Sequence, residues 1–229
     1  MPRIARVVLV DLPHHVTQRG NNRQQVFFTD ADYLAYLAWL KQYTEQYGLA
    51  VLAYCLMPNH VHLIVIPHTV IALSRAVGRT HLRYTQRHHL IHAGSGHLWQ
   101  NRFFSCALDE EYLWTALRYV ERNPERAGLV TQAWDYPWSS AAAHCGGKDT
   151  SGLLDLSAWA ALCPPAAWRD QLAVPEDEED VRLMRRQTQL GRPVGSDAFL
   201  ARLEREAGLD CHPRPVGRPK KTVDGGGDE

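Results

Sequence analysis

The chain has 229 residues, of which 45% are hydrophobic and 22% are charged, with 25 basic and 25 acidic side chains. This is ordinary globular composition, and the length suits one large domain or one medium domain with an appendage. A net charge of zero excludes a nonspecific polycation, but it leaves a single basic face open, because net charge does not say where the charges lie.

Alternating strands and helices are predicted along the first 140 residues. Turn residues separate them: Gly48 ends the first helix, and Pro58 with Asn59 turns between two strands. The predicted series is, in chain order, a strand at 14–19, a helix at 30–46, strands at 51–56 and 60–66, a helix at 70–89, a strand at 102–108 and a helix from 109 to about 123. The order β-α-β-β-α-β matches the ferredoxin-like split arrangement. The predicted fold class is therefore α+β with an antiparallel sheet.

The pattern weakens after about residue 150, and the charge changes along the chain. The net charge is +4 over residues 1–126, −7 over 127–181 and +3 over 182–229. We expect a main domain at 1–150, an acidic linker at 151–181 and a basic tail at 182–229. The tail is expected to hold short helices at 181–190 and 196–207 and a disordered end at 213–229, which is rich in Pro, Gly and charge. The acidic run at 176–180 could compete with an anionic partner for a basic face.

Cysteine usage and the N-terminus indicate the compartment. The five cysteines are far apart and form no CxxC pair, which argues against a disulfide framework and fits a reducing cytosol. The short apolar run near the N-terminus contains Asp11 and is not a signal peptide, and no stretch approaches the roughly 18 apolar residues that span a bilayer. We expect a cytoplasmic protein with no membrane contact.

The sharpest local feature is a pair of histidines spaced two apart. Strand side chains alternate between faces, so His60 and His62 share one face while Val61 points to the core. Two imidazoles side by side on a strand can hold a divalent metal. The alternative is two half-exposed histidines that make ordinary hydrogen bonds, and the spacing alone leaves both open.

A second feature lies in the helix that follows residue 109. Its apolar stripe should pack on the sheet, with Tyr112 and Tyr119 on one flank. Asn123 follows Tyr119 by four residues, so the two are neighbours on the helix surface. The alternative is a boundary tyrosine with a hydrated hydroxyl and an asparagine that ends the helix before Pro124.

Basic and amide side chains offer candidate contacts for DNA. Arginines spaced four apart along the helix at 70–89 form a stripe that could track phosphates or be a solvated face. The polar loop after the first strand could bind backbone or base edges, or simply form a turn. A Gly-Arg-Pro core near the C-terminus resembles an AT-hook, which inserts arginine into a narrow minor groove. The candidates are Arg19, Asn21, Arg23, Arg79, Arg83, Arg102 and Arg218.

Four motifs then occur together and in order. They are HVTQRGNNR at 15–23, YCLMPNHVHLI at 54–64, LWQNRF at 98–103 and YVERNPERAGLV at 119–130. In combination they resemble the REP-associated tyrosine transposases, relatives of the single-strand DNA transposases in the HUH superfamily. The resemblance covers about residues 1–145. It implies that the domain at 1–150 is a ferredoxin-like HUH catalytic domain.

The resemblance also implies roles for individual residues. His60 and His62 match the ligands of Mg²⁺ or Mn²⁺, and Tyr119 matches the nucleophile because it opens the Tyr-x-x-x-Asn-Pro segment. Asn123 matches the third ligand, where related transposases have Gln. Tyr112 is the rival nucleophile. Imidazole and amide ligands suit Mn²⁺ better than Mg²⁺, which prefers oxygen.

The implied activity is metal-dependent cleavage and rejoining of single-stranded hairpin DNA of the repetitive extragenic palindrome (REP) type. The reaction would pass through a 5′-phosphotyrosine, as in DNA transposition. The partner would be hairpin DNA, bound by a monomer or homodimer at the bacterial nucleoid. Two alternatives stay open: a catalytically idle nucleic-acid-binding module, and a phosphodiesterase that uses water while Tyr119 is structural.

Overall fold

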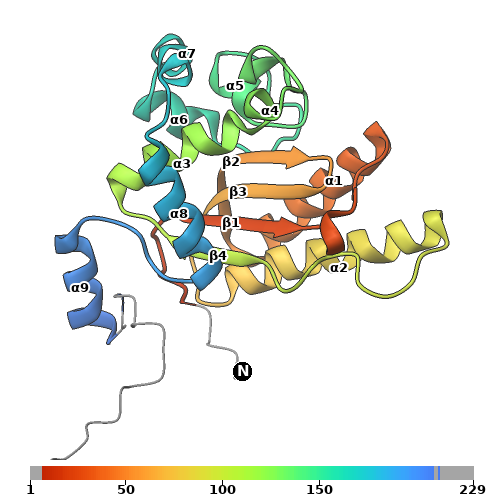
Figure 1. Cartoon of the computed structure of the whole chain (residues 1–229), viewed down its shortest axis with the longest axis horizontal. Helices are drawn as coiled ribbons and strands as arrows, with labels where there is room; N and C mark the ends of the chain where they lie inside the picture. The colour runs from red at the N-terminus through yellow and green to blue at the C-terminus, as the bar shows by residue number, and fades with distance from the viewer. Residues whose placement is uncertain (1–6, 209–210, 212–229) are drawn as a thin grey trace, which may run out of the picture.

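The computed structural model describes residues 7–208 and residue 211. Its centre is a four-stranded antiparallel sheet in the order β2-β3-β1-β4, with helices on both faces (Figure 1). The strands are β1 (His14–Arg19), β2 (Leu49–Met57), β3 (His60–Pro67) and β4 (Phe104–Ala107). The chain passes through them as β-α-β-β-α-β, which confirms the predicted ferredoxin-like α+β arrangement.

Two long helices cover one face of the sheet. They are α1 (Asp30–Tyr47) and α2 (Ala72–His92). The start of α1 is fixed because the backbone N–H of Thr29 donates to Asp32 Oδ2 at 3.1 Å, and its end is fixed by Gly48, whose φ of 67° is left-handed. Fully buried Tyr36 and Leu40 pack with the strand residue Leu63 in the core of this layer.

The opposite face of the sheet carries α3 (Glu110–Glu121) and the single turn α4 (Asn123–Arg126). Asp109 caps α3, since its carboxylate accepts the backbone N–H of Tyr112 at 2.9 Å. Buried Leu117 and Val120 pack against Ile64 of β3. The helix ends at Glu121, two residues before the predicted end near Asn123, because α4 begins there with Pro124 in its first turn.

The β2–β3 hairpin sets the face on which each of its side chains lies. In its register, His62 lies opposite Thr17 of β1 and Cys55 of β2, while His60 lies opposite Arg19. Val61 is fully buried among the residues that contact α1 and α2. The two histidines therefore face α3, as the period of two predicts.

The described residues after Arg126 add five helices. They are α5 (Ala141–His144), α6 (Leu156–Leu162), α7 (Pro165–Ala173), α8 (Glu178–Leu190) and α9 (Asp197–Ala207), and two short 3-10 turns lie at Asn21–Arg23 and Ala133–Asp135. The region expected as an acidic linker contains α6 and α7, and Trp168 of α7 is fully buried. The division of the chain into three domains stays a prediction.

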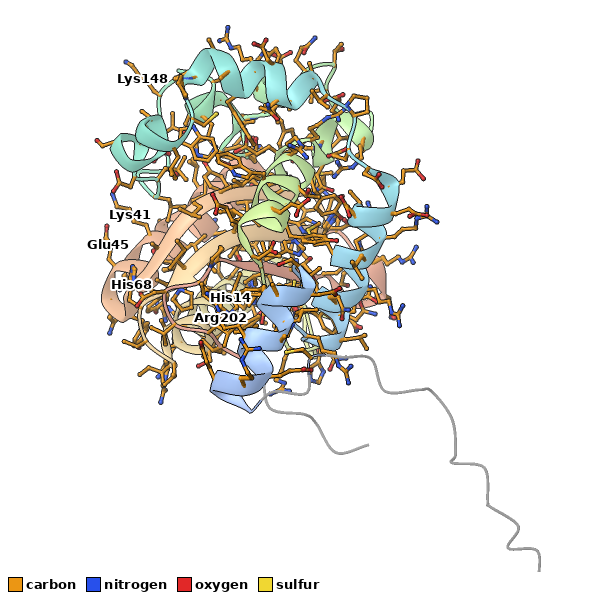
Figure 2. All side chains as sticks on the ribbon, turned by 90° about the vertical axis from the view of Figure 1, so that its left-hand side faces the viewer. His14, Lys41, Glu45, His68, Lys148 and Arg202 are labelled. Atoms are coloured by element: carbon orange, nitrogen blue, oxygen red, sulfur yellow. The ribbon has the colours of Figure 1, made fainter. Side chains whose placement is uncertain are left out.

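The position of α8 matters most for the site. In Figure 1 it crosses the sheet in front of β1 and β4, beside α3. Figure 2, turned by 90°, shows α8 and α9 toward the viewer, with Arg202 on α9, while Lys148 lies near the helices at the top. The basic tail helix predicted at 181–190 is thus packed on the main domain.

One prediction falls on residues outside these findings. The disordered end at 213–229, including Arg218, lies outside the described residues. Among the residues that the structure describes, no helix combines the length and the apolar character needed to cross a membrane.

Candidate active site

A cavity of about 590 Å³ opens where β1 and β3 meet α3, α4 and α8. It brings together the candidate nucleophile and the three candidate metal ligands of the sequence analysis, which are Tyr119, His60, His62 and Asn123. The rest of the lining comes from His15, Thr17, Arg19, Met57, Arg126, Ala127, Arg185, Thr188 and Gln189. Residues more than 120 positions apart therefore form one site, with α8 as its outer wall.

The two histidines are held at nearly right angles. Their ring centroids are 5.0 Å apart with an interplanar angle of 83°. His60 Nδ1 lies 2.6 Å from the amide oxygen of Asn59 in the hairpin turn, to which it donates. This hydrogen bond leaves Nε2 of His60 as the nitrogen with a lone pair.

A chain of three side chains fixes the other histidine. The Thr188 hydroxyl donates to the Met184 carbonyl at 2.8 Å, so Thr188 accepts at its oxygen from His15 Nδ1, also at 2.8 Å. Nε2 of His15 then has a lone pair and accepts from Nδ1 of His62 at 2.9 Å. The proton of His62 is thereby assigned to Nδ1, and its Nε2 is bare.

This unpartnered nitrogen is the strongest sign that the site fits a metal. Nε2 of His62 is buried and has no hydrogen-bond partner among the residues described. A buried nitrogen without a partner is costly and calls for an explanation, such as an ion. Metal-binding histidines commonly donate their other ring nitrogen to a neighbouring acceptor, as both histidines do here.

The charge state of the histidines also suits a metal. Burial lowers the pKa of His60 to about 4, with a smaller effect of Arg19. Burial, and then the neighbouring His60, holds the pKa of His62 well below its usual value. Burial likewise lowers the pKa of His15 to about 3. All three rings are neutral near pH 7, which is the form that binds a cation.

Asn123 lines the same cavity as the two histidines. Its amide nitrogen donates to the carbonyls of Tyr119 at 3.0 Å and Val120 at 3.3 Å, so the amide oxygen is the atom available to a ligand. Across the described part of the chain, no three His, Cys, Asp or Glu side chains gather as a metal site. Two imidazoles and one amide oxygen nevertheless form a mixed donor set that fits Mn²⁺ better than Mg²⁺.

Tyr119 lies on the other side of the cavity between two arginines. Its hydroxyl accepts from Nε of Arg185 at 3.0 Å. The guanidinium carbons of Arg126 and Arg185 lie 4.4 and 4.9 Å from the centroid of its ring. The His62 ring meets the Tyr119 ring edge-on, with centroids 5.4 Å apart. Two cations thus surround the aromatic ring, and one donates to its oxygen.

Tyr112, the rival nucleophile, has a different environment. Its hydroxyl donates to Asp180 at 3.2 Å, and it does not line the cavity. Burial, and then the Asp180 carboxylate, raises the pKa of Tyr112 to about 12. Of the two tyrosines, the structure brings only Tyr119 to the histidines.

The predicted DNA contacts separate into three groups. Arg19 lines the main cavity, and Asn21 with Arg102 lines a second polar cavity of about 420 Å³. Arg23 is exposed in the turn after β1, with a left-handed φ of 61°. Arg79 and Arg83 are exposed on α2, which covers the face of the sheet opposite Tyr119. The arginine stripe on α2 therefore lies away from the candidate active site.

Among the lining residues that the sequence analysis did not single out, four hold the site together through hydrogen bonds, which are His15, Arg126, Arg185 and Thr188. His15 and Arg126 lie inside the first and last of the four motifs, so their place in those motifs is a usable signal. Arg185 and Thr188 lie in the weakly patterned tail, where no spacing or motif marks them. Only the packing of α8 against α3 and β4 reveals them.

Comparisons with known proteins show which proteins this chain is similar to. A curated Haemophilus influenzae protein assigned as a REP-associated tyrosine transposase is 27% identical over 112 residues, which cover 44% of this chain and 63% of that protein. The chain thus spans less than two thirds of the relative it matches. A structure described as a REP-associated tyrosine transposase bound to a REP hairpin shares the fold, with a TM-score of 0.52 at 20% identity over 68% of this chain and 90% of the other.

The family assignment rests on a longer match. Residues 9–123, half of the chain, match the model of the family described as Transposase IS200 like. The match covers β1 to α3 and reaches Asn123, so it includes both histidines and Tyr119. This chain therefore belongs to the IS200-like transposase family.

Proposed function

We propose that this chain cleaves and rejoins single-stranded hairpin DNA, with Tyr119 as the nucleophile and with a divalent metal held by His60, His62 and Asn123. One observation carries the proposal. The Tyr119 ring lies edge-on to His62, whose Nε2 is buried and bare within the described structure, and both line one cavity. A nucleophile beside side chains that can hold a divalent metal is an arrangement suited to phosphoryl transfer.

The cleavage step is an in-line displacement at phosphorus. A bond forms between the Tyr119 oxygen and the phosphorus, and the bond from phosphorus to the 3′ oxygen breaks. The phenolic proton leaves to solvent, and the departing 3′ oxygen takes up a proton. The product is a 5′-phosphotyrosine and a free 3′ hydroxyl, so a later attack by a hydroxyl can rejoin the strand without ATP.

The chain's own residues prepare that step. Arg185 donates to the Tyr119 oxygen and favours the negative charge that develops there as the proton leaves. Arg126 lies over the same ring and holds the Tyr119 carbonyl at 2.5 Å, which fixes the start of α4 and thus Asn123. A bound Mg²⁺ or Mn²⁺ would polarise a non-bridging oxygen of the phosphate.

The proposed substrate is a hairpin of the REP type with a single-stranded flank. The likeness to the hairpin-bound transposase structure supports this choice. The second polar cavity, lined by Asn21, His97, Gln100, Asn101 and Arg102, supplies amide and guanidinium groups suited to base edges.

The test is a denaturing gel of labelled hairpin DNA incubated with the protein and Mn²⁺. The wild-type protein should give a covalent protein–DNA adduct, Tyr119→Phe should give none, and the matched control Tyr112→Phe should keep it. Combined His60→Ala and His62→Ala changes should abolish cleavage and Mn²⁺ binding while hairpin binding persists. Cleavage without an adduct would instead favour attack by water, and binding without cleavage would favour an idle binding module.

A further inference from the structure

A second arginine-rich cavity adjoins the candidate active site. It measures about 440 Å³ and lies between α4, α8 and the segment that joins α7 to α8. Its lining is Arg122, Arg126, Pro175, Glu176, Glu178, Val181, Arg182 and Arg185. Four guanidinium groups and two carboxylates surround this small cavity, so its lining carries an excess of positive charge, which favours an anion.

A carboxylate of the chain itself occupies this cavity. Glu176 accepts from Nη1 of Arg126 at 2.5 Å and from Nη1 of Arg122 at 3.3 Å. Its side chain is only 9% exposed, although the acidic run that it begins is largely exposed. Glu176 is thus the member of that run that is turned inward onto the arginines.

The two cavities share a wall. Arg126 and Arg185 line both of them. On the other side of this wall, Arg126 holds the Tyr119 carbonyl and Arg185 donates to the Tyr119 hydroxyl. A strand with one phosphate at Tyr119 would therefore have its neighbouring phosphate within reach of the arginine cavity.

We propose that this cavity binds a backbone phosphate of the single strand next to the phosphate that Tyr119 attacks, and that the Glu176 carboxylate occupies this place in the free protein. The inference rests on the proposed function for the position of the strand. Carboxylate and phosphate present similar oxygens to a guanidinium, so one can replace the other. Entry of DNA exchanges Glu176 for phosphate, and the exchange lowers the affinity for DNA.

The decisive measurement is the affinity of the full chain for two labelled probes without divalent metal. One probe is a hairpin DNA with a single-stranded flank, and the other is the same hairpin without it. Glu176→Gln should bind the flanked probe roughly tenfold more tightly at low salt, and its dependence on log salt should steepen by about 0.7, the value for one added phosphate contact on a single strand. The flankless hairpin should bind Glu176→Gln and the wild-type protein alike.

A matched variant controls for net charge. Glu179 belongs to the same acidic run, is exposed and does not line the cavity, so Glu179→Gln removes an equal charge elsewhere. This control should change the affinity for the flanked probe by less than about twofold. Equal gains in Glu176→Gln and Glu179→Gln, or an equal gain for both probes, would overturn the inference.

A second pair of variants tests the arginine cavity without changing the buried Glu176. Arg182 lines the cavity, while Arg186 lies on the same helix, is exposed and lines neither cavity. Arg182→Gln should weaken binding of the flanked probe severalfold, and Arg186→Gln should weaken it less. Equal effects of the two changes would contradict the inference.

These outcomes are separable from those of the cleavage test. If the wild-type protein forms the adduct but Glu176→Gln shows no gain in affinity, the arginine cavity alone is refuted. If Glu176→Gln binds more tightly but no variant cleaves, the cavity stands as a phosphate site and the proposed reaction fails.

Discussion

Nε2 of His15 lies 2.9 Å from Nδ1 of His62, and the two rings are nearly parallel, with centroids 5.1 Å apart and an interplanar angle of 8°. This contact places the proton of His62 on Nδ1 and leaves Nε2 free in the cavity. His15 itself is fixed by Thr188 of α8. A helix from the C-terminal part of the chain thus orients a candidate metal ligand on β3.

The first prediction concerns Thr188. Thr188→Val keeps the shape of the side chain but removes the acceptor for His15, so the His62 tautomer is no longer fixed. The affinity for Mn²⁺ should fall about 10- to 100-fold, as for other partners of metal-binding histidines. Calorimetric titration of Mn²⁺ measures it without DNA. Thr80 is a buried threonine with the same hydroxyl bond to the carbonyl four residues earlier, so Thr80→Val is the control and should bind Mn²⁺ like the wild-type protein.

The second prediction concerns Arg185. Arg185→Gln removes the cation that donates to the Tyr119 hydroxyl, so the rate of adduct formation with hairpin DNA should fall roughly 100-fold. The rate is measured at saturating DNA, which separates it from any loss of binding. Arg186→Gln, on the exposed side of the same helix, should react at the wild-type rate. An unchanged rate in Arg185→Gln would remove Arg185 from the reaction.

The third prediction concerns a buried network behind Tyr119. Glu121 is fully buried and accepts from Ser140, from His144 Nδ1 at 2.6 Å and from Trp168 Nε1 at 2.7 Å. It ties α3 to α5 and α7. Glu121→Gln keeps the volume but replaces an acceptor with a donor, so one partner loses its bond.

The cost should be about 1–3 kcal/mol in the free energy of unfolding, measured by urea denaturation. Glu111 is exposed on the same helix, so Glu111→Gln should change the free energy by less than about 0.5 kcal/mol. Equal stability of the two variants would mean that the network does not hold the tyrosine helix.

The fourth prediction concerns pH. Burial lowers the pKa of His81 to about 3, whereas an unfolded histidine titrates near 6.5. The unfolded chain therefore binds the proton first, and stability falls as the pH drops from about 6.5 toward 3. The slope is about 1.4 kcal/mol per pH unit for one such group.

Thermal unfolding between pH 7 and pH 4 measures this slope. His81→Gln should lose stability less steeply than the wild-type protein, because one titrating group is gone. If His81→Gln lost stability with falling pH as steeply as the wild-type protein, the lowered pKa assigned to His81 would be wrong.

The fold of the first 126 residues is predictable because local signals agree with the packing. The sequence predicts a strand at 14–19, and β1 spans His14–Arg19. The turn at Pro58 and Asn59 and the alternation around Val61 fix both the hairpin and the face of each histidine. Helix ends are less predictable from the sequence. Helix α3 ends at Glu121 because a new turn begins at Asn123. The position of that turn depends on the packing of Pro124 and Arg126.

Only part of the site is predictable from the sequence, because some of its residues carry no local signal. His60, His62, Tyr119 and Asn123 carry spacing and motif signals, and the structure brings them into one cavity. Arg185 and Thr188 have neither signal, since their role depends on how an amphipathic helix docks some 60 residues after Tyr119. Arg79 and Arg83 show the converse: a regular arginine stripe lies on the helix layer away from the site.

The most direct test of the account is to identify the residue that carries the DNA. Hairpin DNA and Mn²⁺ are incubated with the full chain, the adduct is digested with nuclease and protease, and the modified peptide is sequenced by mass spectrometry. If Tyr119 is the nucleophile, the modified peptide carries a single nucleotide phosphate on Tyr119. A phosphate on Tyr112, or cleaved DNA with no modified tyrosine, would contradict it.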